Sequence, residues 1–184
     1  MRTFLRLLLI LTVITVFCLA ANASATPSAE AIYSEINLGG GLWQYDYSFV
    51  NTSDPVANAG VTLYDMFFQF NSSQSVTVVS LPSGWDNTSG LGFVETFSLN
   101  PGVPPVGTDI APGASLNGFV FQFNYQAGPL AFAATLVNPL DANNPFVYNG
   151  TSGPATVPLP PALALLGPGL VGLASVRKRF GKQS

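Results

Sequence analysis

The side chains that could carry out chemistry in the central part of this 184-residue chain are carboxylates. All nine acids lie between Glu30 and Asp141, whereas all six Lys and Arg residues lie before residue 7 or after residue 176, and the chain has no His. The one cysteine, Cys18, lies near the N-terminus. The centre therefore has a formal charge of −9. This composition excludes Ser-His and Cys-His nucleophiles, a Schiff-base lysine and a His or thiolate metal site. It also excludes a nucleic-acid or phosphate surface, because no cation is available to pair with phosphate.

Two carboxylates are enough for glycoside hydrolysis if they lie roughly 5 or 6.5–9.5 Å apart. Asp46 and Glu95 each fall on the polar face of an expected strand and form the candidate pair. The alternative is that both are solvated residues that keep a sheet soluble and prevent edge pairing. No other polar machinery surrounds them, so we favour the second interpretation and expect no enzyme.

Oxygen-rich turns and one tryptophan are the remaining candidates for binding. Asp54, Asp86 and the loop at 141–144 could supply oxygen ligands to calcium. Such residues are also ordinary turn formers, and none has the spacing of a calcium loop, so we expect neither a metal nor a cofactor. Trp85 lies in a Gly-Trp-Asp turn and is the candidate glycan platform. The alternative, which we favour, is that Trp85 closes one end of the core.

The central part of the chain is a series of apolar runs of period two, separated by Gly, Pro, Asn and Ser, which indicates β-strands. The expected strands are 31–38, 42–50, 61–70, 75–81, 92–99, 116–125, 130–137 and 146–148. No helical stripe appears between the two ends. The sequence therefore predicts an all-β fold, a two-sheet antiparallel β-sandwich of about eight strands, flanked by an N-terminal signal helix and a C-terminal hydrophobic helix.

Aromatic residues alternate along several of these strands and define the expected core. The rows are Trp43, Tyr45, Tyr47 and Phe49; Tyr64, Met66, Phe68 and Phe70; Phe93, Phe97 and Leu99, with Glu95 among them; and Phe119, Phe121, Phe123 and Tyr125. We expect each aromatic row to face the layer between the sheets, where a fully buried ring contributes on the order of 2–3 kcal/mol.

Residues 1–25 have the three parts of a secretory signal peptide. Arg2 and Arg6 form a basic start, residues 7–21 are mainly apolar, and Ala23-Ser24-Ala25 supplies small residues at the two positions that a signal peptidase reads. We expect cleavage after Ala25, with cleavage after Ala23 as the alternative. The mature body is then exported without a cysteine and is held together by packing alone.

The C-terminal residues have an equally regular order. An expected linker of small residues at 150–156 leads into Val157-Pro158-Leu159-Pro160-Pro161, followed by an apolar segment at 162–176 and a basic tail at 177–184 that contains Arg177, Lys178 and Arg179. The apolar stretch would span about 27 Å as a helix, and the basic tail would stay in the cytoplasm. The prolines cannot continue this helix, so they leave an extended, accessible stretch at the membrane face.

The order of proline motif, Gly- and Leu-rich apolar segment and Arg-Lys-Arg resembles the PEP-CTERM class of sorting signals in its VPLPA-type variant. Pro161 departs from that variant, which usually carries Ala at this position, and residues 180–184 follow the basic cluster. The resemblance implies processing by an exosortase, an integral membrane enzyme. It also implies delivery to the cell surface or extracellular matrix of a Gram-negative bacterium, after transient anchoring in the inner membrane.

The expected domain order is a signal peptide at 1–25, a β-sandwich ectodomain at 26–149, a linker at 150–156 and a sorting signal at 157–184. The expected function is that of an exported structural or adhesive protein of the surface or matrix, associated with exopolysaccharide. Two alternatives stay open: a carbohydrate-binding module at the cell surface, and a simple C-terminally anchored bitopic envelope protein.

Overall fold

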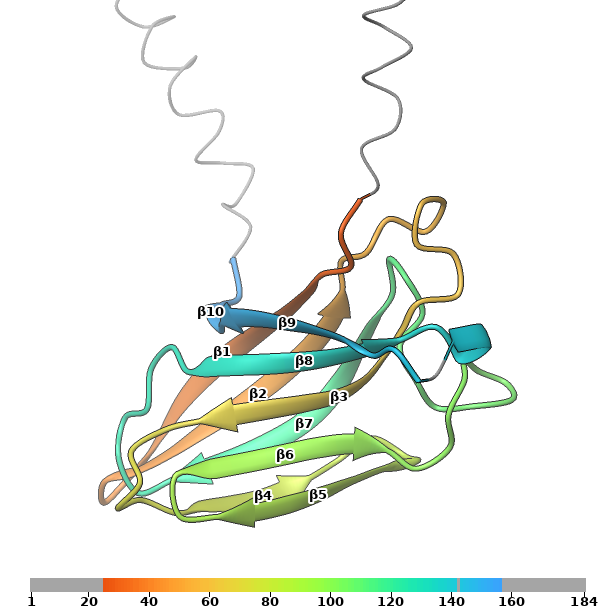
Figure 1. The fold of residues 1–184 in the computed structure, drawn as a ribbon. Coiled ribbons are helices and arrows are strands. Elements are labelled where there is room, and N and C mark those ends of the chain that lie inside the picture. The colour runs from red at the N-terminus through yellow and green to blue at the C-terminus, as the bar shows by residue number, and fades with distance from the viewer. Residues whose placement is uncertain (1–24, 142, 157–184) are drawn as a thin grey trace, which may run out of the picture. The chain divides into compact units, whose positions relative to one another are not determined.

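The computed structural model describes residues 25–141 and 143–156, and within them the chain forms ten strands in two sheets (Figure 1). Sheet A has the order β10 (Gly153–Pro154), β1 (Ala29–Gly39), β2 (Leu42–Asn51), β7 (Ser115–Phe123) and β4 (Val76–Ser80). Sheet B has the order β5 (Trp85–Gly90), β6 (Phe93–Ser98), β3 (Thr62–Gln69), β8 (Ala131–Val137) and β9 (Phe146–Thr151). The one helical element among the described residues is a short 3-10 turn, η1 (Pro139–Asp141). The predicted all-β, two-sheet fold is confirmed for this part of the chain.

The two expected flanking helices fall at residues 1–24 and 157–184, outside the described residues. Residues 25–141 and 143–156 contain no helix that could serve as a membrane span.

The layer between the sheets is aromatic, as the alternating pattern predicts. Tyr45, Tyr47 and Phe49 of β2 are at most 1% exposed. The rings of Phe49 and Phe119 stack with centroids 3.9 Å apart, within sheet A. Tyr47 and Phe68, whose centroids are 5.0 Å apart, join sheet A to sheet B. Because successive side chains of a strand point to opposite sides, this layer also decides which residues reach the outer faces.

The expectation that the row of Phe93 and Phe97 faces the core is wrong. Val94 and Thr96 of β6 are fully buried instead. They lie opposite Phe68 and Met66 in the register with β3. The pleat therefore places Phe93 and Phe97 on the outer face of sheet B.

Tyr64 is also absent from the core, although the pattern places it in the same row as Met66. The pairing of β3 with β8 shifts register between Leu63 and Asp65, and this irregularity buries Leu63 completely. One extra residue on one strand changes the side to which the preceding side chains point.

Strand β5 is missing from the sequence prediction. Its residues Asp86, Asn87, Thr88, Ser89 and Gly90 have the composition of a turn. They nevertheless form a ladder with β6 from Trp85 opposite Ser98 to Gly90 opposite Phe93. Pairing with a neighbouring strand overrides weak local β-propensity here.

The expected linker at 150–156 is largely part of the folded body. Gly150 and Thr151 belong to β9, and Gly153 and Pro154 form β10, which pairs in parallel with β1 at Ile32 and Tyr33. Between them lies Ser152, whose N–H donates to the carbonyl of Leu130 and whose hydroxyl accepts the N–H of Leu130, both at 2.8 Å. The body therefore extends to Pro154, and only Ala155 and Thr156 separate it from Val157.

Glycine in β9 has a packing reason. A Cβ atom at Gly150 would lie 2.5 Å from Cζ of Phe132, a ring in the core. Gly150, the first residue of the expected linker, therefore lies where a strand needs glycine to pack against an aromatic ring.

We expect Phe49→Ala to destabilise the body by about 3–5 kcal/mol, because it removes a fully buried ring that stacks on Phe119. Urea unfolding of the full chain measures this change. Val79→Ala is the matched control: Val79 is 51% exposed on the edge strand β4 and should change stability by less than about 0.5 kcal/mol. Similar losses in both variants would contradict the central role of the aromatic layer.

Candidate functional site

The outer face of sheet B, which we call the B face, collects the polar and aromatic groups best suited to binding. The strand registers align its side chains in three rows across the sheet. The rows are Asp86, Phe97, Asp65, Thr135 and Val147; Thr88, Glu95, Phe67, Ala133 and Asn149; and Gly90, Phe93, Gln69, Ala131 and Thr151. The B face thus combines rings, carboxylates and amides on one surface.

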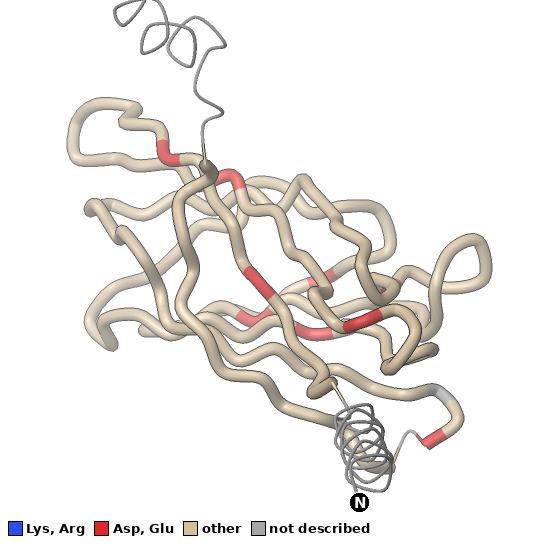
Figure 2. The backbone as a smooth tube through the Cα atoms, turned by 90° about the horizontal axis from the view of Figure 1, so that it is seen from above, with Lys and Arg blue, Asp and Glu red and all other residues tan. Residues whose placement is uncertain are grey.

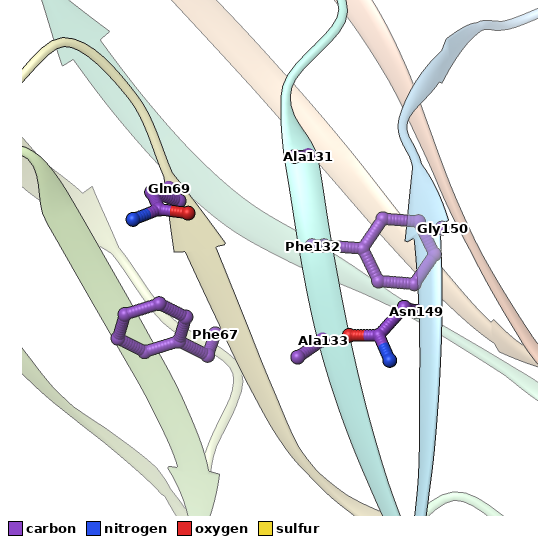
Figure 3. A pocket seen from close by; sticks show the side chains of 7 residues that line it. All are labelled: Phe67, Gln69, Ala131, Phe132, Ala133, Asn149 and Gly150. Atoms are coloured by element: carbon purple, nitrogen blue, oxygen red, sulfur yellow. The ribbon is translucent and has the colours of Figure 1, made fainter.

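A groove of about 210 Å³ lies on the B face (Figure 3). Phe67 and Gln69 extend from β3 on one side, and Asn149 extends from β9 on the other. Between them, β8 contributes the short side chains of Ala131 and Ala133 together with Phe132, and β9 also contributes Gly150. A row of small residues between two rows of larger ones creates the groove.

One wall of the groove is aromatic. The rings of Phe67 and Phe93 stack with centroids 5.7 Å apart and planes 15° apart, and both are half-buried. The Phe93 ring also covers Gly90, where a Cβ atom would lie 2.6 Å from its Cε1. This stack is an apolar surface next to the polar side chains of Gln69 and Glu95.

Beside these rings lies a pair of carboxyl groups, Asp65 on β3 and Glu95 on β6. They are diagonal neighbours on the B face, because Glu95 lies opposite Phe67 and Asp65 lies opposite both Phe97 and Thr135. Partial burial raises the pKa of Asp65 to about 7, and the hydrogen bond and negative charge of Glu95 act in the same direction. The pair therefore holds a shared proton up to near-neutral pH.

The arrangement can donate and accept protons and hydrogen bonds. The candidate pair of Asp46 and Glu95 does not come together. Asp46 is on β2 of sheet A and Glu95 is on β6 of sheet B, and each points away from the aromatic layer between the sheets.

Trp85, the candidate glycan platform, is also in the wrong place for that role. It is 5% exposed, its ring packs edge-on against Phe119 at 5.0 Å, and its Nε1–H donates to the carbonyl of Thr108 at 2.9 Å. The indole is enclosed because the loop that carries Thr108 folds over it. Trp85 is part of the core, as the favoured alternative states.

The predicted processing residues lie mainly outside the described residues. Val157, Pro158, Leu159, Pro160 and Pro161, the basic residues Arg177, Lys178 and Arg179, and Ala23 are all in this category. Ala25 is described, and its carbonyl accepts a hydrogen bond of 2.8 Å from Nδ2 of Asn58.

The candidate calcium loops hold their oxygens in local hydrogen bonds. Oδ1 of Asp54 accepts the N–H groups of Val56 and Ala57, and the carboxylate of Asp141 accepts Nδ2 of Asn144 at 3.0 and 3.1 Å. In the part of the chain that the structure describes, no three acidic side chains come together in a way that could hold a metal ion.

The sequence prediction missed Asp65, Phe67, Gln69 and Asn149 as site residues. One signal for them exists: Asp65, Phe67 and Gln69 share the face of β3 opposite Met66 and Phe68, so an aromatic residue stands among polar ones on an outward face. The position of β3 between β6 and β8 comes from the order of strands in the sheet. The alternation of residues along one strand does not reveal this order.

No family model matches the chain, and no curated protein sequence matches it. Among solved structures, the chain is similar to the GH20 exo-β-N-acetylglucosaminidase of Vibrio harveyi in complex with N-acetylglucosamine, at 11% identity and a TM-score of 0.38, over 69% of this chain and only 18% of that enzyme. It is similar to the chitin-binding domain of Chi18aC from Streptomyces coelicolor at 18% identity and a TM-score of 0.37, over 57% of this chain and 90% of that domain. At these TM-scores the likenesses assign neither a family nor a ligand to this chain.

We expect the stability of the folded chain to fall as the pH rises through the window set by Asp65. The pKa of this carboxyl is about 7 in the folded state and 3.8 as its ordinary value, so the folded chain binds more protons between these pH values. Asp65→Asn removes this titration. It should flatten the pH dependence of the free energy of unfolding and make the variant more stable than the unchanged chain above about pH 7.

Urea unfolding at a series of pH values measures this effect. Asp86→Asn is the control, because it removes an exposed carboxylate from the same face without touching the pair. Parallel curves for the unchanged chain and Asp65→Asn would show that the two carboxyl groups do not share a proton.

Proposed function

We propose that this chain is an exported surface protein whose β-sandwich binds extracellular polysaccharide through the B face, in a structural or adhesive role. The observation that carries the proposal is the groove bounded by Phe67, Gln69 and Asn149, next to the stacked rings of Phe67 and Phe93. The role is that of a binding protein rather than an enzyme.

The chemistry of the B face matches that of a sugar. A pyranose ring has apolar C–H faces and an edge of hydroxyl groups, so it needs both an apolar surface and groups that donate and accept hydrogen bonds. The Phe67–Phe93 stack supplies the first. The exposed amides of Gln69 and Asn149 supply the second, since each can donate and accept.

Two features of the groove suit a polymer. It lies on the open surface of a sheet, and its walls come from β3 and β9, which flank β8. A chain of sugars can therefore lie across the surface without its ends having to enter a closed pocket.

The ends of the sequence support delivery to the outside of the cell. The order of signal peptide, body, proline motif, apolar segment and basic tail resembles that of PEP-CTERM proteins. On this proposal an exosortase processes the chain, and the C-terminal segment lies in the inner membrane before processing. Cell surface or extracellular matrix is the proposed location. The short distance in sequence from Pro154 to Val157 requires the processing enzyme to work within a few residues of the folded body.

We expect Phe67→Ala to reduce retention of the full chain on the exopolysaccharide of the cells that make it by about tenfold or more, because it removes the ring that lines the groove. Asn149→Ala, on the opposite wall, should weaken retention as well. Affinity electrophoresis in gels that contain the polysaccharide measures both effects.

Ile36→Ala is the matched control for surface hydrophobicity. Ile36 is 42% exposed on the outer face of sheet A, and its substitution should leave retention unchanged. Thermal unfolding of each variant shows whether the body is folded. Unchanged retention by folded Phe67→Ala and Asn149→Ala would rule out the B face as the binding site.

We expect the mature protein to begin at Thr26 and to end near Pro158 to Pro161, because the signal peptide and the sorting tail are removed. Intact-mass analysis of the protein released from cells tests both ends. A mass that still includes Arg177, Lys178 and Arg179 would instead indicate a bitopic envelope protein.

A further inference from the structure

We infer that the B face selects polysaccharides that carry free amines, such as a polymer of hexosamine units with ammonium groups, and that Asp65 and Glu95 form the ion pairs that select them. This inference rests on the proposed function of the B face as a polysaccharide site.

The charge of the B face is of one sign. Asp65, Asp86 and Glu95 lie on it, and the described part of the chain contains no Lys, Arg or His (Figure 2). The phenol of Tyr64 also lies near these two acids, and its pKa is raised by burial and by the charges of Asp65, Asp109 and Glu95. Polyanionic polysaccharides are therefore repelled from this surface, and cationic ones are attracted to it.

The carboxyl pair lies where an amine on a bound sugar would reach it. Glu95 stands directly opposite Phe67 in the register between β6 and β3, and Phe67 lines the groove. Directly opposite residues of an antiparallel pair have Cβ atoms about 4.5–5.5 Å apart, which is about the width of one sugar ring. Phe67 stands between the groove, which Ala133 lines, and Glu95, so a sugar that extends from the groove over the Phe67 ring brings its substituents to the carboxyl of Glu95.

An ammonium group resolves the unfavourable contact between the two acids. Without a ligand, Asp65 and Glu95 avoid facing each other as two charges by sharing a proton. A cation that binds between them can replace this proton, which leaves to water. Both carboxylates then accept hydrogen bonds from one charged donor, and such bonds are stronger than those between neutral groups.

Three rings next to the pair favour an organic cation. Phe97 lies opposite Asp65, and Phe67 and Phe93 flank Glu95 on the same face. Aromatic faces attract ammonium groups, and the apolar surroundings limit access of water to the ion pair. A metal ion is a poorer fit, because no third acidic ligand joins Asp65 and Glu95 among the described residues.

The test compares three oligosaccharides of equal length: a glucosamine hexamer with free amines, its fully N-acetylated counterpart and a glucose hexamer with the same linkage. Binding to the full chain is measured by calorimetry at low ionic strength, at a mildly acidic pH at which the sugar amines are protonated. We expect the free-amine hexamer to bind about tenfold or more tightly than the other two, and added salt to reduce this preference.

Glu95→Gln should remove most of the preference for the free-amine hexamer while leaving the affinity for the N-acetylated hexamer nearly unchanged. Asp65→Asn is a second variant with the same expected effect, and thermal unfolding establishes that both are folded. The control is Glu30→Gln, which removes an exposed acid from the outer face of sheet A. This variant removes the same amount of negative charge as Glu95→Gln, but from outside the B face. It should therefore keep the full preference for the free-amine hexamer.

The outcomes separate this inference from the proposed function. Equal affinity for all three hexamers, or a preference that Glu95→Gln and Asp65→Asn leave intact, overturns the inference. If the neutral hexamers still bind in that case, and Phe67→Ala weakens their binding, the B face remains a polysaccharide site. If the unchanged chain binds none of the hexamers, or Phe67→Ala leaves their binding unaltered, both the inference and the proposed site are wrong.

Discussion

The contact between aromatic rings in the layer between the two sheets is the interaction on which the rest of this structure depends. The only cysteine of the chain is Cys18, so the body from Ala25 to Pro154 has no disulfide, and packing must supply its stability. The Tyr47–Phe68 contact joins the two sheets, and the Phe49–Phe119 stack fills the layer on the side of sheet A. Each ring that points into this layer fixes the residues before and after it on an outer face.

The B face is a direct consequence of that constraint. Burial of Met66 and Phe68 forces Asp65, Phe67 and Gln69 outward, and burial of Val94 and Thr96 does the same for Glu95 and its aromatic neighbours. The short side chains of Ala131 and Ala133 then leave space between the rows. An apolar stack, a proton-sharing carboxyl pair and two amides are brought together because the core on the reverse side of the sheet is tightly specified.

Hydrogen bonds hold both ends of the folded body in place. The carbonyl of Ala25 is bound by Asn58, and Ser152 is held by both backbone groups of Leu130 just before β10. The ordered body therefore begins at Ala25, next to the expected signal cleavage site, and ends at Pro154, three residues before Val157. In the proposed function, the folded body is therefore nearly the whole of the mature protein, and its outer faces are the surfaces that meet the surroundings.

The sequence alone specifies the all-β class, most strand positions and the aromatic rows of β2 and β7, because a strict alternation of apolar residues has only one stable arrangement relative to a core. It also determined that the chemistry of the body is limited to carboxylates, amides, hydroxyls and rings. It did not determine which face of β6 is buried, since Phe93, Glu95 and Phe97 alternate as regularly as Val94 and Thr96. The pairing of strands in sheet B decides this, because it places Val94 opposite Phe68. The same pairing brings Asp65 beside Glu95. It also places Phe67 and Asn149 on either side of Ala133. These residues are far apart in the chain, and only the pairing of distant strands, driven by burial of the shared core, brings them onto one surface.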